Sequence, residues 1–223
     1  MGSGVVQFGD NIIRKDASGN SYIGGPANFT KVEADGTVQF NGDAIVWDDL
    51  RVTVNQVKVP AAKYPAWTAY SAGLLLGYLY QAVEGNEEEV YFVVQLPHSY
   101  KEGSDITPHV HWVGNENATD ASEIVRWGLE YEWINMDGSF SATTTIWVDA
   151  TIEDDEGDKH FLNSFAAIDG TGKTISSVLI CRLFRNSSHE NDTYDSGTAL
   201  ALLIDVDIHF ELDTVGSRAI LTK

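Results

Sequence analysis

The stretch from Leu200 to Leu212, LALLIDVDIHFEL, decides the fold class. Apolar side chains alternate with other residues along most of it, and from Asp205 onward the intervening side chains are polar. Because successive side chains of a strand point to opposite faces, this period-2 pattern predicts a long half-buried strand. We expect the other face to be acidic and solvated. The expected core residues are Leu200, Leu202, Ile204, Val206, Ile208, Phe210 and Leu212.

Similar alternation recurs upstream. Apolar residues fall on one face between Val90 and Leu96 and again between Val125 and Trp133, and Asp137-Gly138 is a hairpin signal. No segment has a 3.6-residue period long enough for a major helix. The spacing of roughly seven to nine strands predicts an all-β fold, an antiparallel β-sandwich that is jelly-roll-like, with an extended N-terminal arm.

The domain organisation follows from composition. Residues 1–30 are rich in Gly, Asn and Ser and show little periodicity, so we interpret them as an N-terminal arm that is disordered or ordered by a neighbouring subunit. Residues 31–223 are expected to form a single β-sandwich domain. Within them, residues 60–80 hold two prolines and many aromatics, which indicates a loop or one short helix leading into a strand.

The charge balance restricts the possible partners. The chain of 223 residues has 33 acidic and 14 basic side chains, a net charge of −19. This excess disfavours nucleic acids and anionic membranes as partners, because both are bound largely through Lys and Arg. The single cysteine, Cys181, lies among aliphatic residues and is expected to be a core residue. The N-terminal sequence lacks the features of a secretory signal, so we expect the protein to be made inside the cell.

One pattern indicates a metal site. His109 and His111 lie two residues apart on an expected strand, so both can face one ion, and Glu116 follows at the spacing of the first cupin motif. The match then fails, because Glu123 stands where that motif needs glycine and no second motif follows. We therefore favour two half-buried histidines of a sheet over a metal site made by His109, His111 and Glu116.

Other candidate sites are weaker still. On the acidic face of residues 205–211, ligands at positions i, i+2 and i+4 of a flat strand spread over ~13 Å, too far for one ion. The acidic loop at residues 153–158 lacks calcium-loop spacing, and residues 170–174 resemble the end of a phosphate-binding loop but precede an expected strand. Glu130 and Glu132 could serve glycoside hydrolysis as a carboxylate pair, but such pairs arise freely on any solvated strand. No Gly-x-Ser-x-Gly elbow marks a serine nucleophile. We predict no catalytic residues, no cofactor and no enzyme activity.

Five stretches carry a resemblance to a known family: residues 42–51, 94–105, 108–112, 126–131 and 205–213. Together they resemble a family of uncharacterised structural proteins of tailed bacteriophages. The resemblance covers roughly residues 42–218 and brings no catalytic residues with it. It implies a virion component made in the host cytoplasm, such as a capsid decoration (cement) protein or a neck or tail-adaptor part. Its expected partners are capsid or other virion proteins and its own copies, with a trimer favoured.

Two alternatives from other functional classes stay open. The first is a carbohydrate-binding module for host attachment on a phage tail or fibre, using aromatic side chains of residues 64–80 as stacking surfaces. The second is a cupin-like metal-binding protein that uses the two histidines and Glu116.

Overall fold

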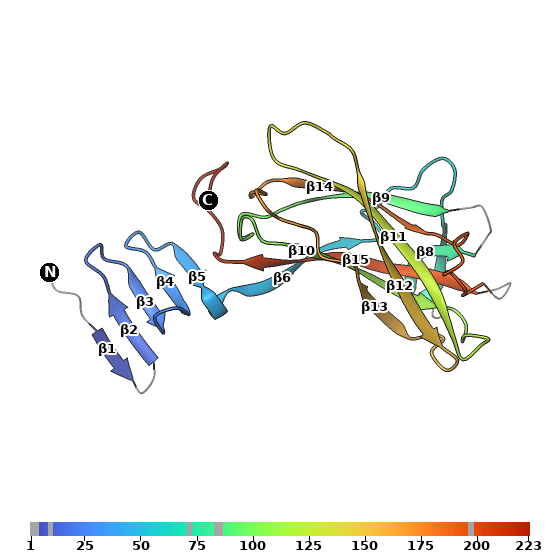
Figure 1. Ribbon diagram of the computed structural model, residues 1–223, viewed down its shortest axis with the longest axis horizontal. Helices are drawn as coiled ribbons and strands as arrows, with labels where there is room; N and C mark the ends of the chain where they lie inside the picture. The colour runs from blue at the N-terminus through green and yellow to red at the C-terminus, as the bar shows by residue number, and fades with distance from the viewer. Residues whose placement is uncertain (1–4, 9–10, 71–72, 83–86, 196–198) are drawn as a thin grey trace.

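The computed structural model describes the chain except for residues 1–4, 9–10, 71–72, 83–86 and 196–198 (Figure 1). The described residues form antiparallel strands, joined by loops and one short 3-10 helix, η1 (Gly42–Ala44). No helix in these residues has the length and apolar character needed to cross a membrane. The all-β antiparallel prediction is confirmed.

Eight strands form the two packed sheets of the sandwich, and a hairpin described below adds two more strands to the first of them. One sheet has the order β13-β10-β15-β6, and the other has the order β12-β11-β14-β9. The bounds are β6 (Val46–Thr53), β9 (Glu88–Gln95), β10 (Ile106–Gly114), β11 (Ser122–Ile134), β12 (Thr144–Glu153), β13 (His160–Ser164), β14 (Val178–Arg185) and β15 (Leu200–Leu212).

The pairing of these eight strands is nested. The first strand pairs with the last (β6 with β15), the second with the seventh (β9 with β14), the third with the sixth (β10 with β13) and the fourth with the fifth (β11 with β12). The pairs β10–β15 and β11–β14 then join them into two sheets. This nesting is the topology of a double-sheet jelly roll, as the sequence predicts.

The core lies between the two sheets. The alternating residues of β9 and β11 supply one side of it, including Phe92, Trp127 and Leu129, and β10 and β15 supply the other side, including Trp112 and Phe210. The residues that alternate with these core residues along each strand face outward, and Val93 of β9, for example, is exposed to solvent. At about 25 cal/mol per Å² of apolar surface, this burial is the main force that holds the sheets together.

The long strand β15 departs from the predicted alternation at one point. A β-bulge places Asp205 opposite His111 but Leu203 opposite Trp112, so Ile204 has no partner on β10. An extra residue exchanges the two faces. Ala201 and Leu203 therefore continue the core between the sheets in place of the expected Ile204, which is only partly buried, and the expected Leu202 is fully buried but on the opposite face of the strand. The acidic face is also not solvated as expected, because Asp205 and Asp207 are both buried.

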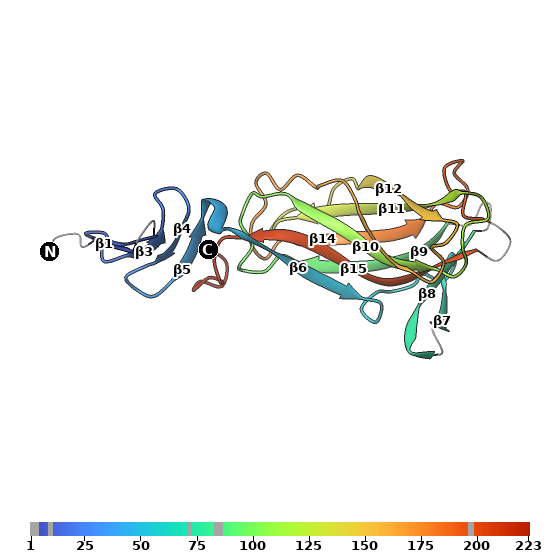
Figure 2. The same cartoon turned by 90° about the horizontal axis from the view of Figure 1, so that it is seen from below.

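Residues 60–80 contain two strands, where a loop or one short helix leading into a strand is expected from the sequence. β7 (Ala66–Tyr70) and β8 (Leu75–Gln81) form a hairpin, and β8 pairs with the first part of β15. The hairpin projects from the sandwich in Figure 2. Aromatic residues such as Trp67 and Tyr78, which lie opposite each other in the hairpin, suit a strand as well as a loop. The aromatic content of this stretch therefore does not distinguish a loop from a strand.

The N-terminal segment extends from one end of the jelly roll, as Figures 1 and 2 show, but it is folded. Five strands form a consecutive meander, so the residues expected to form an extended arm (1–30) pair with one another within the chain, and the expected boundary at residue 30 falls inside β4. The strands are too short for their periodicity to show in the sequence. They are β1 (Val5–Phe8), β2 (Asn11–Lys15), β3 (Ser21–Gly24), β4 (Phe29–Val32) and β5 (Val38–Asn41).

The meander joins the jelly roll through its last strand. Gln39 of β5 bridges to Thr214, which follows β15, and the Phe40 N–H donates to the carbonyl of Asp213 at 2.6 Å. The Thr214 hydroxyl donates to the carbonyl of Val38 at 2.8 Å. The strand order leaves β1 at the opposite edge of the sheet.

A buried tyrosine makes the fold sensitive to alkaline pH. Burial raises the pKa of Tyr100 to about 12, and burial also holds the pKa of Tyr80 well above its ordinary value. The unfolded chain releases the Tyr100 proton near pH 10 but the folded chain keeps it to about pH 12. In this window the unfolded state binds fewer protons, so the free energy of unfolding falls as pH rises.

We expect the Tyr100 contribution, about 3 kcal/mol, to be present below pH 10 and lost towards pH 12. Urea titrations at several pH values between 9 and 12 measure how steeply the free energy of unfolding falls with pH. The variant Tyr100→Phe should reduce that slope. An unfolding free energy independent of pH in this range would contradict the prediction.

Candidate functional site

A cluster of histidine and aspartate side chains lies on the outer face of the sheet β13-β10-β15-β6. We call it the His–Asp cluster. Strand pairing assembles it: His109 of β10 lies opposite Asp207 of β15, and Asp49 of β6 lies opposite His209 of β15. Directly opposed residues share a face of a sheet. The cluster consists of Asp49, His109, His111, Asp207 and His209.

Asp207 is the centre of the cluster. Its side chain is only 9% exposed. The Nδ1 of His109 lies 2.9 Å from its Oδ1, and the Nε2 of His111 lies 2.8 Å from its Oδ2. Only the second contact has the geometry of a hydrogen bond, and Oδ1 is fully buried without a hydrogen-bond partner in the described structure. A buried acceptor left unpaired is unusual in proteins.

The remaining members are fixed from the neighbouring strands. The Nδ1 of His209 lies 2.5 Å from Oδ1 of Asp49, and its ring stacks on Trp47 with centroids 4.7 Å apart and planes at 3°. The Nδ1 of His111 lies 2.9 Å from Nε2 of His160, so one of these two nitrogens carries the hydrogen.

Arg51 adds a positive charge at the edge of the cluster. Its guanidinium donates to Asp205, with Nε at 3.0 Å from Oδ2, and this hydrogen bond raises the pKa of Arg51. Arg51 is thus the ionic partner of Asp205, whereas Asp207 is contacted by His109 and His111. The two carboxylates of β15 therefore have different partners although they lie two residues apart.

The structure brings the two predicted histidines together but not the predicted glutamate. His109 and His111 share one face of β10, and both contact Asp207. Glu116 lies beyond the end of β10, where its N–H donates to the hydroxyl oxygen of Tyr194 at 2.9 Å. In the sequence, the β10 histidines and the β15 acidic face are two separate features, and nothing associates Asp49 with either of them. The alternation on both strands was the available signal, but only strand pairing joins them.

The other sequence candidates have structural explanations. In the acidic loop, the Nζ of Lys159 lies 3.4 Å from Oε1 of Glu156, so this carboxylate has a lysine as its ionic partner. The Lys173 ammonium donates to the carbonyl of Trp133 at 2.6 Å, and strand β14 follows the turn that contains it. Burial raises the pKa of the Cys181 thiol, which keeps it protonated at neutral pH.

Comparison with known proteins adds little beyond the architecture. No family model matches the chain, and no curated protein matches it. Among solved structures, it is similar to TmCBM61 in complex with β-1,4-galactotriose, with a TM-score of 0.32 and 12% identity over 73% of this chain and 86% of that one.

Two further solved structures are similar over a smaller share of their own length. The Clostridium thermocellum xylanase 10B CBM22-1–GH10 modules with xylohexaose match with a TM-score of 0.39 and 13% identity, over 78% of this chain and 30% of that one. The infectious bursal disease virus structure (Gx strain) matches with a TM-score of 0.37 and 10% identity, over 88% and 42%. Likenesses this distant carry no argument about function.

Proposed function

We propose that this chain is a bacteriophage virion structural protein, a capsid decoration protein that binds neighbouring subunits on the particle. In this role it acts by contact between proteins and not by catalysis, and its partners are other virion proteins and further copies of itself. The phage origin is supported by the resemblance of the five stretches in residues 42–218.

The observation that carries the proposal is the N-terminal meander. From Ile13 to Arg51 no side chain is buried, so this sheet has no core of its own in the described residues. Small sheets need a packed apolar face for stability. A sheet that projects from the jelly roll without such packing is best explained by a neighbouring subunit that covers it.

One face of the meander is apolar. The register places Ile13 opposite Ile23, Ile23 opposite Thr30 and Thr30 opposite Phe40, so these side chains share a face. Ile13 is 42% exposed and Ile23 is 53% exposed. We define the apolar meander face as Ile13, Ile23, Val32, Val38 and Phe40.

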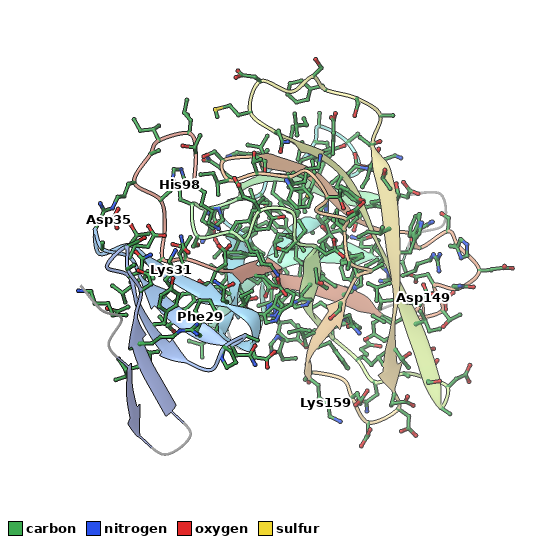
Figure 3. The ribbon with its side chains drawn as sticks, turned by 60° about the vertical axis from the view of Figure 1, so that its left-hand side comes forward. Phe29, Lys31, Asp35, His98, Asp149 and Lys159 are labelled. Atoms are coloured by element: carbon green, nitrogen blue, oxygen red, sulfur yellow. The ribbon has the colours of Figure 1, made fainter. Side chains whose placement is uncertain are left out.

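The opposite face of the meander is closed by its own contacts. The Arg14 guanidinium lies 4.7 Å from the centroid of the Tyr22 ring, and the Tyr22 ring meets the Phe29 ring edge-on at 5.3 Å. Phe29 and Lys31 of β4 belong to this face and are labelled in Figure 3. The exposed apolar surface therefore lies on one side only, as a docking face requires.

Charge also favours contact through the meander. Residues 1–41 contain 3 basic and 4 acidic side chains, a net charge of −1, whereas residues 42–223 contain 11 and 29, a net charge of −18. The strongly negative jelly rolls of neighbouring copies therefore repel one another, whereas the nearly neutral meanders have no such repulsion. We therefore place the contact between copies on the apolar meander face.

Lysine substitutions on this face test the proposal. We expect the double variant Ile13→Lys/Ile23→Lys to weaken self-association by at least about tenfold, because an interface would bury two unpaired charges. Both positions are exposed in the single chain, so the unfolding midpoint of the monomer should stay unchanged. Light scattering over a concentration series, together with co-sedimentation with particles, measures the effect.

The matched control is Val93→Lys, an apolar side chain that is 60% exposed on β9 of the jelly roll. It should leave association intact. A parent chain that stays monomeric and does not co-sediment with particles would refute docking through the meander, as would equal losses for both variants.

A second candidate function rests on the β7–β8 hairpin. Tyr64 is 56% exposed and Trp67 is 46% exposed, and Trp67 meets Tyr78 edge-on at 4.9 Å. Exposed aromatic rings are the usual stacking surfaces for sugars. A carbohydrate-binding module would bind at least one ligand on a glycan array and lose it in Trp67→Ala, while no binding to any glycan would remove this candidate.

A further inference from the structure

We infer that Asp49, His109 and Asp207 bind a divalent first-row transition-metal ion such as Zn²⁺. The three side chains come from three neighbouring strands, β6, β10 and β15. One ligand atom from each lies within 4.8 Å of the other two. This site is independent of the proposed docking role, and it differs from the set that the sequence indicated.

The buried Oδ1 of Asp207 is the main argument for an ion. This oxygen is shielded from solvent, lacks a hydrogen-bond partner in the described structure, and lies 2.9 Å from the Nδ1 of His109. A carboxylate oxygen and an imidazole nitrogen that meet without hydrogen-bond geometry can both face a common ion. The ion would give both atoms a partner and offset the cost of burying the carboxylate.

The third ligand closes the site from its exposed side. Bonds of about 2.0–2.2 Å to Zn²⁺ keep two ligand atoms no more than about 4.4 Å apart. The Asp49 side chain is 46% exposed and has room for the small movement that this limit requires. The same exposure leaves an open position for water or for a ligand atom of a partner.

The surrounding contacts orient the two carboxylates. The Nε2 of His111 lies 2.8 Å from Oδ2 of Asp207, so a hydrogen bond fixes that carboxylate with Oδ1 towards the site. His209, held against Trp47, contacts Asp49 in the same way. Hydrogen-bonded partners of this kind are typical of ligands in protein metal sites.

The donor set selects the class of ion. One imidazole and two carboxylates suit Zn²⁺, Mn²⁺ or Fe²⁺, whereas Ca²⁺ takes six to eight oxygen ligands and Mg²⁺ also prefers oxygen. We therefore expect Zn²⁺ and Co²⁺ to bind with one ion per chain, and Ca²⁺ and Mg²⁺ to bind far more weakly.

The first test uses the full chain without an affinity tag, stripped of metal by a chelator. Zn²⁺ at a concentration about 100 times its dissociation constant should raise the melting temperature by about 5–10 °C. Co²⁺ should give visible absorption bands that Zn²⁺ abolishes by competition. Absence of both the thermal shift and the bands would overturn the inference.

Single substitutions test the ligand assignment. Asp49→Asn and His109→Gln should each reduce Zn²⁺ affinity by at least about tenfold. Asp49 is exposed, so Asp49→Asn should melt like the parent without metal and decides the matter if His109→Gln does not fold. The control Glu116→Gln removes the carboxylate that the sequence pattern indicated and should bind Zn²⁺ like the parent.

Zn²⁺ binding by these variants decides between the set Asp49, His109 and Asp207 and the set that contains Glu116. Parent-like Zn²⁺ binding by Asp49→Asn would overturn the assigned set. Loss of binding in Glu116→Gln would overturn it as well and would favour the cupin-like set.

Discussion

Replacing Asp192 by asparagine is expected to destabilise the protein by about 3–5 kcal/mol, because it leaves a fully buried arginine without its counter-ion. Arg185 and Asp192 both have side chains with 0% exposure. Two hydrogen bonds join them: Nε of Arg185 donates to Oδ2 at 3.0 Å, and Nη2 donates to Oδ1 at 2.7 Å. Guanidinium groups do not lose their charge, so the variant keeps a buried cation.

The loss extends beyond the ion pair itself. Oδ2 of Asp192 also accepts the N–H of Arg126 at 2.9 Å, so the carboxylate ties the loop after β14 to β11. Arg185 further donates to the carbonyls of Tyr80 and Tyr194. Typical domains are stable by only 5–15 kcal/mol, so this single change removes a large share.

The control for this prediction is the more exposed pair Arg126 and Asp149. Asp149 of β12, labelled in Figure 3, is 35% exposed and lies on the outer face of the sheet β12-β11-β14-β9. Asp149→Asn should cost about 1 kcal/mol or less. Urea unfolding of both variants measures the difference, and equal losses would show that burial of Arg185 has no special cost.

The second large effect is expected at Trp127. Its side chain is fully buried at the centre of the core, where its ring centroid lies 5.0 Å from that of Tyr80 and 6.2 Å from that of Trp112. Trp127→Ala removes these contacts and leaves a cavity, at a cost of about 3–5 kcal/mol. The expected result is a fall in the urea midpoint without a change in the oligomeric state.

Trp127→Phe distinguishes packing from hydrogen bonding at this position. The indole Nε1 is buried and has no hydrogen-bond partner among the described residues. Phenylalanine fills much of the volume and removes the unpaired donor, so this variant should be clearly more stable than Trp127→Ala. If phenylalanine costs as much as alanine, the indole nitrogen has a bonding role that the structure does not contain.

The jelly roll could be predicted from the sequence because its core strands are long. β9, β11 and β15 each carry enough alternating residues for the period to stand out, and their buried faces follow that period over most of their length. The bulge at Ile204 could not be predicted, because an uninterrupted run of apolar residues fits either register. Its effect on Leu202 and Leu203 required the pairing with β10.

The meander was missed for a different reason. Its strands have four or five residues each, and none of its described side chains is buried, so no hydrophobic period marks them. Glycine-rich turns between such strands have the same composition as a disordered arm. In the candidate site, Asp49 could not be associated with Asp207 because they are far apart in the sequence and meet only through β6–β15 pairing.

The central claim, a virion protein that binds neighbouring subunits, is tested most directly by quantitative mass spectrometry of phage particles purified from lysates that contain this chain. The proposal predicts its peptides in a constant ratio to the major shell protein across gradient fractions and preparations. A chain found only in the soluble fraction of the lysate, and absent from the particles, would contradict it.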